Sequence, residues 1–180
     1  MKSIAVYCGA SNGAKPLYAD AARDLARVLV EHNIALVYGG GKVGLMGVIA
    51  DEVLRLGGEA TGVIPRALVE REVGHAGLTR LFVVKDMHER KAMMADLAEG
   101  FIAMPGGFGT LEELFEMVTW SQLGIHAKPI GLLNVDGFYD GLVHFARHQV
   151  QEGFVREGHA GLMHVDADAD ALVKRLRGVS

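Results

Sequence analysis

The chain has 180 residues, which suffices for one domain with a substantial core and is short for two. Half of the residues are hydrophobic and the net charge is -4, which gives no reason to expect nucleic acid or an anionic membrane as partner. The single cysteine, Cys8, excludes an intrachain disulfide framework and fits a reducing cytosol, and residues 3–8 form too short an apolar run for a signal peptide. A cytoplasmic protein is therefore expected, and the apolar composition favours a partner subunit that covers part of the surface.

Short apolar runs alternate with helical patterns along the chain. Strands are expected at residues 3–8, 35–38, 60–64, 80–84, 101–104 and 129–133. Apolar residues at a spacing of three to four predict helices at 17–31, 45–56, 87–98, 111–123, 138–151 and 167–177. Near-continuous apolar strands separated by helices indicate a parallel sheet that is covered on both faces. The sequence therefore predicts one α/β domain over residues 1–180, with a Rossmann-like, doubly wound sheet.

Three of the expected strands are followed by glycine clusters, at residues 9–13, 39–44 and 106–109. Ligands of doubly wound folds bind outside the carboxyl ends of the strands, and glycine lets the backbone approach a ligand closely. Three clusters on one edge favour a shared pocket over three unrelated turns. The candidate contacts for a phosphate or ribose in the first two loops are Gly9, Ser11, Gly40, Gly41 and Gly44.

The second cluster also has the glycine spacing of a dinucleotide-binding loop. Gly39, Gly41 and Gly44 match G-x-G-x-x-G, and Glu59 lies near the position of the acid that binds the ribose. That loop normally follows the first strand of the fold, whereas this one follows the second. A phosphate or ribose loop is therefore favoured over an NAD site.

The third cluster leads into a helix that we expect to open at Thr110. Backbone N–H groups of residues 106–109 can turn inward, and a helix N-terminus attracts an anion, so a phosphate is the natural ligand. Thr110 and Glu113 also have the spacing of a capping box. The residues alone leave open whether Glu113 caps the helix or takes part in chemistry. Near a helix N-terminus its carboxylate would be ionised, which suits a base or an electrostatic stabiliser.

The expected helix at 87–98 carries a charge inside its apolar stripe. Met87, Arg90, Met94 and Leu97 fall along one face, and a buried arginine needs an anionic partner. Arg90 either snorkels towards water or faces a cleft, and we favour the cleft. Lys91 points about 100° away, and the pattern alone favours a solvated lysine.

No metal site is expected from the remaining polar residues. The eight histidines show no ligand-like pairing. Asp166, Asp168 and Asp170 lack the glycine-centred loop of a calcium site and are interpreted as a helix start with its solvated face.

Residues 105–113, which read PGGFGTLEE, match the PGGxGTxxE motif, and the chain resembles the LOG (Lonely Guy) family. Members of that family are cytokinin riboside 5′-monophosphate phosphoribohydrolases and are often mislabelled lysine decarboxylases. Residues 6–11, 36–41, 44–47 and 86–91 extend the resemblance, which covers residues from about 4 to 145.

The resemblance implies hydrolysis of the bond between N9 of an adenine-type base and C1′ of a ribose 5′-monophosphate, without metal or redox cofactor. It implies that Arg90 and Glu113 are the catalytic pair and that the protein is a homodimer with sites near the subunit interface. The substrate contacts that it implies are Glu72, Arg90, Lys91, Gly107, Phe108, Gly109, Thr110, Leu111, Glu112, Glu113 and Thr119.

Two rival functions remain on the sequence alone. A decarboxylase would need pyridoxal phosphate on a lysine, and no lysine is marked for this role by the pattern. A non-catalytic nucleotide sensor or carrier could share the glycine loops. The preference between cytokinin nucleotides and AMP is also left open.

Overall fold

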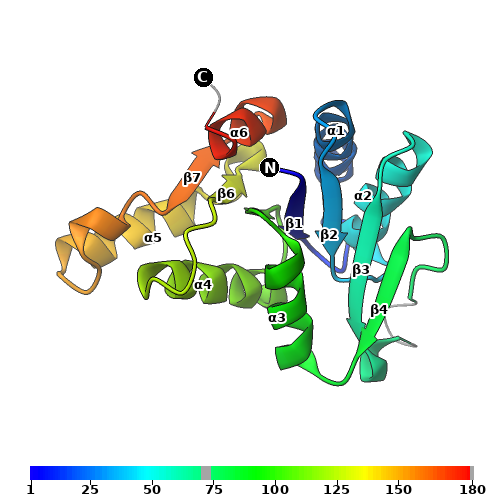
Figure 1. Ribbon diagram of the computed structural model, residues 1–180. Coiled ribbons are helices and arrows are strands. Elements are labelled where there is room, and N and C mark those ends of the chain that lie inside the picture. The colour runs from blue at the N-terminus through cyan, green and yellow to red at the C-terminus, as the bar shows by residue number, and fades with distance from the viewer. Residues whose placement is uncertain (70–73, 179–180) are drawn as a thin grey trace.

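Seven parallel strands form one sheet in the computed structural model, which describes residues 1–69 and 74–178 (Figure 1). The strands are β1 (Ser3–Tyr7), β2 (Ala35–Tyr38), β3 (Ala60–Pro65), β4 (Arg80–Val84), β5 (Phe101–Ala103), β6 (Ile130–Leu133) and β7 (Met163–Asp166). Their order across the sheet is β4-β3-β2-β1-β5-β6-β7. The chain thus builds outward from β1 in one direction and then returns to the other side of β1. The point where the direction reverses lies between β1 and β5, which is where ligands bind in folds of this type.

Six α-helices in the described part of the chain cover the two faces of the sheet (Figure 1). They are α1 (Leu17–Glu31), α2 (Gly44–Arg55), α3 (Met87–Leu97), α4 (Phe108–Gln122), α5 (Asp140–Gln151) and α6 (Ala169–Leu176). Alternate residues of β1 enter two apolar clusters. Ile4 and Val6 pack with α1, α2 and α6, whereas Ala5 and Tyr7 pack with α3 and α4. The predicted Rossmann-like, doubly wound α/β fold is therefore confirmed.

The sequence failed to indicate the last strand, β7. It has four residues, of which His164 and Asp166 are polar, and none of the four is fully buried. β7 lies at the edge of the sheet, and its polar residues interrupt the continuous apolar run that marks the central strands. Asp168, in contrast, caps α6 by accepting a hydrogen bond from the Ala171 N–H at 2.8 Å, as the sequence indicated.

The start of α4 also differs from the expectation. The helix begins at Phe108 with Gly107 at the N-cap, and no side chain caps it. The Leu111 N–H already donates to the Gly107 carbonyl at 3.2 Å. Thr110 is therefore inside the first turn, which excludes the capping box that the spacing of Thr110 and Glu113 had left open.

Candidate active site

The loops after β1 and β5 lie against each other at the point where the strand order reverses. The Gly9 N–H donates to the Pro105 carbonyl at 3.1 Å, and the Leu45 N–H donates to the Gly9 carbonyl at 3.0 Å. Two glycines are required by this packing. A Cβ on Gly44 (φ +59°) would lie 2.3 Å from the Ala10 carbonyl carbon, and one on Gly106 would lie 2.1 Å from Thr110 Oγ1. The glycines thus let three loop segments meet at one edge.

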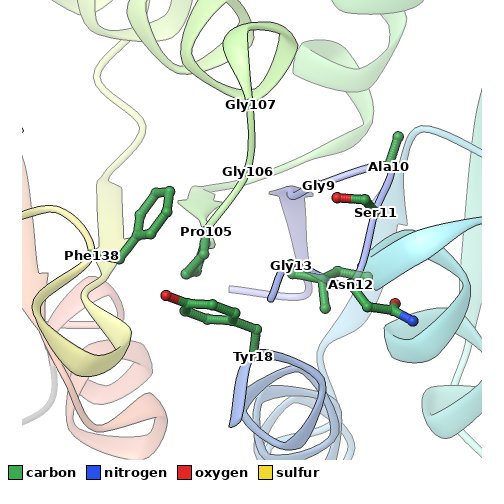
Figure 2. Close-up of a pocket in the computed structure, with 11 residues that line it drawn as sticks. Gly9, Ala10, Ser11, Asn12, Gly13, Tyr18, Pro105, Gly106, Gly107 and Phe138 are labelled. Carbon is green, nitrogen blue, oxygen red and sulfur yellow. The ribbon is translucent and has the colours of Figure 1, made fainter. Parts of the chain in front are cut away.

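Two cavities open at this edge, and Ala10 and Gly107 line both. The aromatic cavity, of about 470 Å³, is lined by Gly9, Ala10, Ser11, Asn12, Gly13, Tyr18, Leu45, Pro105, Gly106, Gly107 and Phe138. Figure 2 shows Tyr18, Phe138 and Pro105 grouped together, with the loop that carries Ser11 and Asn12 across from them. The charged cavity, of about 260 Å³, is lined by Cys8, Ala10, Met46, Leu68, Met87, Arg90, Gly107, Gly109, Thr110, Glu112 and Glu113.

Arg90 enters the charged cavity from the first turn of α3. Asp86 begins this helix by accepting hydrogen bonds from the His88 and Glu89 N–H groups, both at 3.0 Å. The Arg90 side chain is buried, and its Nη2 donates to the Gly39 carbonyl at 3.0 Å. A Cβ on Gly39 would lie 2.0 Å from that nitrogen, so glycine makes room for the guanidinium. Arg90 faces a cleft, as the apolar stripe around it indicated.

Glu113 enters the same cavity from the second turn of α4. The charges of Glu113 and Arg90 both reach the Cys8 thiol at the end of β1, and they shift its pKa in opposite directions. Burial raises the pKa of the Cys8 thiol far above its ordinary value, Glu113 raises it further, and Arg90 opposes the rise. Cys8 is therefore a protonated, buried strand-end residue, as expected, and not a nucleophile. With the capping box absent, Glu113 is not accounted for as a helix cap.

Lys91 differs from the interpretation based on the helical pattern. Its side chain is only 8% exposed, and its Nζ forms ion pairs with Glu112 and, at 3.2 Å, with Glu116 Oε2. The pattern favoured a solvated lysine, and that interpretation is wrong. Lys91 does not line either of the two cavities.

The structure brings together only part of the expected contact set. Gly107, Gly109, Thr110, Glu112, Glu113 and Arg90 line the charged cavity, whereas Gly9 and Ser11 line the aromatic cavity. Neither cavity is lined by Gly40, Gly41, Gly44, Phe108, Leu111 or Thr119. Glu72 lies outside the described residues.

The second glycine cluster has packing roles of its own. A Cβ on Gly40 (φ +77°) would meet Leu81 at 3.1 Å, and Gly41 forms an isolated bridge with Gly74. Glu59, which has the spacing of a ribose-binding acid, precedes β3. It therefore lies at the edge of the sheet opposite to the glycine loops. The dinucleotide spacing of this cluster thus reflects backbone packing.

Sequence reasoning missed the apolar walls of the cleft. Tyr18, Leu45, Met46, Leu68 and Phe138 come from four different segments of the chain, since Leu45 and Met46 are neighbours on α2. Nothing in their local sequence separates them from core residues. Only the folded arrangement places them beside the glycine loops.

The cleft does not fit pyridoxal phosphate. Such a cofactor needs a lysine whose amine can form a Schiff base, and among the described residues no lysine lines either cavity. Burial alone would lower the pKa of Lys91, but its hydrogen bonds to Glu112 and Glu116 raise the value above normal. A lysine that remains charged in this way is a poor Schiff-base nucleophile.

Residues 1–69 and 74–178 contain no group of three or more His, Cys, Asp or Glu side chains that could hold a metal ion. None of the helices in those ranges combines the length and apolar character that a bilayer span requires.

Fold and cleft together define a doubly wound α/β protein with a helix N-terminus and a charged cavity at the point where the strand order reverses. A family model described as "Possible lysine decarboxylase" matches residues 46–176. The chain is 55% identical over 154 residues to cytokinin riboside 5′-monophosphate phosphoribohydrolase LOG2 of Arabidopsis thaliana. The aligned region covers 86% of this chain and 72% of that protein. The chain is also 50% identical over 175 residues to the LOG enzyme of Oryza sativa subsp. japonica, covering 97% and 72%. The chain belongs to the LOG family, as its motif indicated.

Solved structures share the fold at lower identity. The Moco carrier protein of Chlamydomonas reinhardtii superposes with a TM-score of 0.72 at 21% identity, covering 98% of this chain and 97% of that one. The molybdenum cofactor binding protein of Rippkaea orientalis superposes with a TM-score of 0.73 at 19% identity, covering 98% of this chain and 95% of that one. At these identities the likeness concerns the fold alone.

Proposed function

We propose that this chain hydrolyses the N-glycosidic bond of cytokinin riboside 5′-monophosphates or AMP and releases the free base and ribose 5-phosphate. The observation that carries this proposal is the placement of Arg90 and Glu113 in one cavity beside the N-terminus of α4. Membership in a family whose named relatives are phosphoribohydrolases supports it.

The N-terminus of α4 holds the 5′-phosphate. The first N–H groups of a helix have no partner within it and carry a partial positive charge, so they bind an anion well. Gly107, Gly109 and Thr110 line the cavity at this end, and the absence of a side-chain cap leaves the backbone accessible to a ligand. Holding the phosphate here fixes the ribose relative to Glu113, since remote binding energy positions the reacting carbon.

Breaking the glycosidic bond places positive charge on the ribose. As the C1′–N9 bond breaks, its electron pair leaves with the base, and a water oxygen forms the new bond to C1′. The proton that the water loses balances the proton that the base gains. An ionised Glu113 stabilises the ribose charge and accepts the water's proton. Arg90 either binds a substrate anion or keeps Glu113 ionised and oriented.

The enzyme acts as a cytoplasmic homodimer in this proposal. Large apolar side chains are exposed on α4 and the segment after it: Phe108 is 92% exposed, and Phe115, Leu123 and Ile125 are exposed as well. Thr119 lies among them on the same helix. A contact between Thr119 and substrate, as the family resemblance implies, would then be made across the interface to the partner's cleft.

A direct assay of base release tests the function. Purified protein is incubated with isopentenyladenosine 5′-monophosphate, with AMP and with the matching nucleosides that lack the phosphate, and the bases are separated by chromatography. Release from a 5′-monophosphate with much slower release from its nucleoside is expected. Equal turnover of nucleoside and nucleotide would contradict the phosphate assignment. Nucleotide binding without any base release would support a carrier or sensor instead.

A further inference from the structure

A cluster of three charged residues, of which Glu112 is 54% exposed and the other two are largely covered, links α3 to α4 beside the proposed site. Lys91 on α3 pairs with both Glu112 and Glu116, which are one helical turn apart on α4. The side chains of Lys91 and Glu116 are 8% and 23% exposed. A charge this well buried is stable only with its partners, so the cluster fixes how α3 and α4 lie against each other.

Each end of this link is next to a proposed catalytic residue in the chain. Lys91 follows Arg90, and Glu112 precedes Glu113. Successive residues of a helix point about 100° apart, so one neighbour can bridge the helices while the other faces the substrate. Arg90, Glu112 and Glu113 line the charged cavity, whereas Lys91 and its second partner, Glu116, lie outside it. The spacing between the helices therefore also sets the spacing between Arg90 and Glu113.

The same contacts argue against Lys91 as a ligand of the substrate phosphate. Its ammonium is already bound by two carboxylates, so the cluster as a whole carries net negative charge. A negative cluster repels a phosphate. Lys91 also lies outside the linings of both cavities.

We propose that Lys91 is a positioning residue, which holds α4 against α3 so that Arg90 and Glu113 keep their working geometry. This inference rests on the proposed hydrolase function. A ligand role would act on substrate binding, whereas a positioning role acts on the reaction of bound substrate.

The variants Lys91→Met and Lys91→Arg separate these roles. A small misplacement of reacting groups lowers the reaction rate by up to about a hundredfold. Lys91→Met is therefore expected to lower kcat by about tenfold to a hundredfold, with KM within about twofold of the unmodified value. Arginine can meet both carboxylates and should restore most of kcat. Lys85→Met, which changes an exposed lysine just before α3, is the matched control and should leave both constants unchanged. A raised KM with normal kcat for Lys91→Met would overturn the proposal.

Glu116→Gln provides a second test if Lys91→Met does not fold. Glu116 lines neither cavity, so the substitution weakens the cluster from the side that is remote from substrate. It is expected to lower kcat by a few-fold without changing KM. Unchanged kcat, or a raised KM, would contradict a role exerted through the cluster.

Two further measurements distinguish this inference from the proposed function. If the unmodified protein releases no base, the proposed function fails, and AMP affinity and hydrogen exchange then test Lys91. Lys91→Met should keep its AMP dissociation constant within about twofold and exchange the amides of residues 108–117 faster, because α4 has lost its link to α3. A tenfold weaker affinity with unchanged exchange would overturn the positioning role.

Discussion

Arg90 lies in an apolar stripe of α3, yet its guanidinium makes a hydrogen bond and lines the charged cavity. The sequence pointed to it because an arginine within an apolar stripe is costly unless it has a partner, and the structure supplies the Gly39 carbonyl as one. Lys91 was misjudged by the same reasoning. The spacing within one helix shows which residues share a face, but it contains nothing about the carboxylates that α4 brings to Lys91.

Replacing Arg90 by lysine tests the role of the planar guanidinium. A single ammonium cannot both donate to the Gly39 carbonyl and present a pair of coplanar N–H donors to the cavity, as a guanidinium can. We expect Arg90→Lys to lower kcat/KM by about a hundredfold or more, by analogy with the loss of a preorganised electrostatic donor. Steady-state base release measures the effect. A loss below about threefold would show that any cation suffices at this position.

His126 predicts a pH dependence of stability. Burial lowers the pKa of His126, a hydrogen bond to the Met117 carbonyl opposes the shift, and the charge of Lys128 adds to it. Below about pH 6.5 the unfolded chain therefore binds more protons than the folded protein. The stability that neutral His126 contributes is complete above that pH and is lost as the pH falls below it. Its Nδ1 accepts the Lys128 N–H at 3.1 Å, a bond that protonation removes.

Urea unfolding of the unmodified protein and of His126→Asn between pH 8 and pH 5 measures this contribution. Asparagine can still accept the Lys128 N–H but does not titrate. The difference in unfolding free energy between the two proteins should change in favour of the variant as the pH falls. A difference that stays constant across this range would refute the assignment.

At the scale of elements, the glycine loop before α4 was predicted well and the helix start was not. The motif located the loop, the helix and the edge of the sheet where they lie. The spacing of Thr110 and Glu113 also allowed a capping box, but the helix begins earlier, after Gly107. A glycine N-cap carries no side-chain signal, so the sequence could not distinguish the two starts.

Gly106→Ala tests whether the loop requires its close packing. The new Cβ would lie 2.1 Å from Thr110 Oγ1 and 3.0 Å from the Gly9 backbone nitrogen, so the loop must move. We expect a loss of about 1–3 kcal/mol in unfolding free energy and a higher KM. Gly141→Ala on α5 is the matched control, because a Cβ there meets nothing within 4 Å and should not destabilise the fold. Equal stability of the two variants would contradict the packing argument.

At the scale of the molecule, the sheet order could be anticipated only in part. Six of the seven strands, β1 to β6, were indicated by continuous apolar runs, and their shared edge followed from the parallel arrangement. The two cavities and their apolar walls could not be predicted, because Tyr18 and Phe138 are brought together from positions 120 residues apart. Their contact depends on the whole topology and on no local pattern.

The exposed face of α4 predicts the oligomeric state. Apolar side chains along one exposed helix face favour burial against another subunit. We expect light scattering after size exclusion to give a dimer for the unmodified protein and a monomer for Leu123→Glu. Phe154→Glu changes an even more exposed apolar residue away from α4 and should remain dimeric. A monomeric unmodified protein would contradict the proposed interface.

The most direct test of the account is the rate of base release by Glu113→Gln. Glutamine has nearly the same shape as glutamate but cannot stabilise positive charge or accept a proton as a carboxylate does. We predict a thermal midpoint close to that of the unmodified protein, retained binding of AMP, and base release slowed by about 10²-fold or more. Base release within a few-fold of the unmodified rate would show that Glu113 is not catalytic, and the proposed mechanism would be wrong.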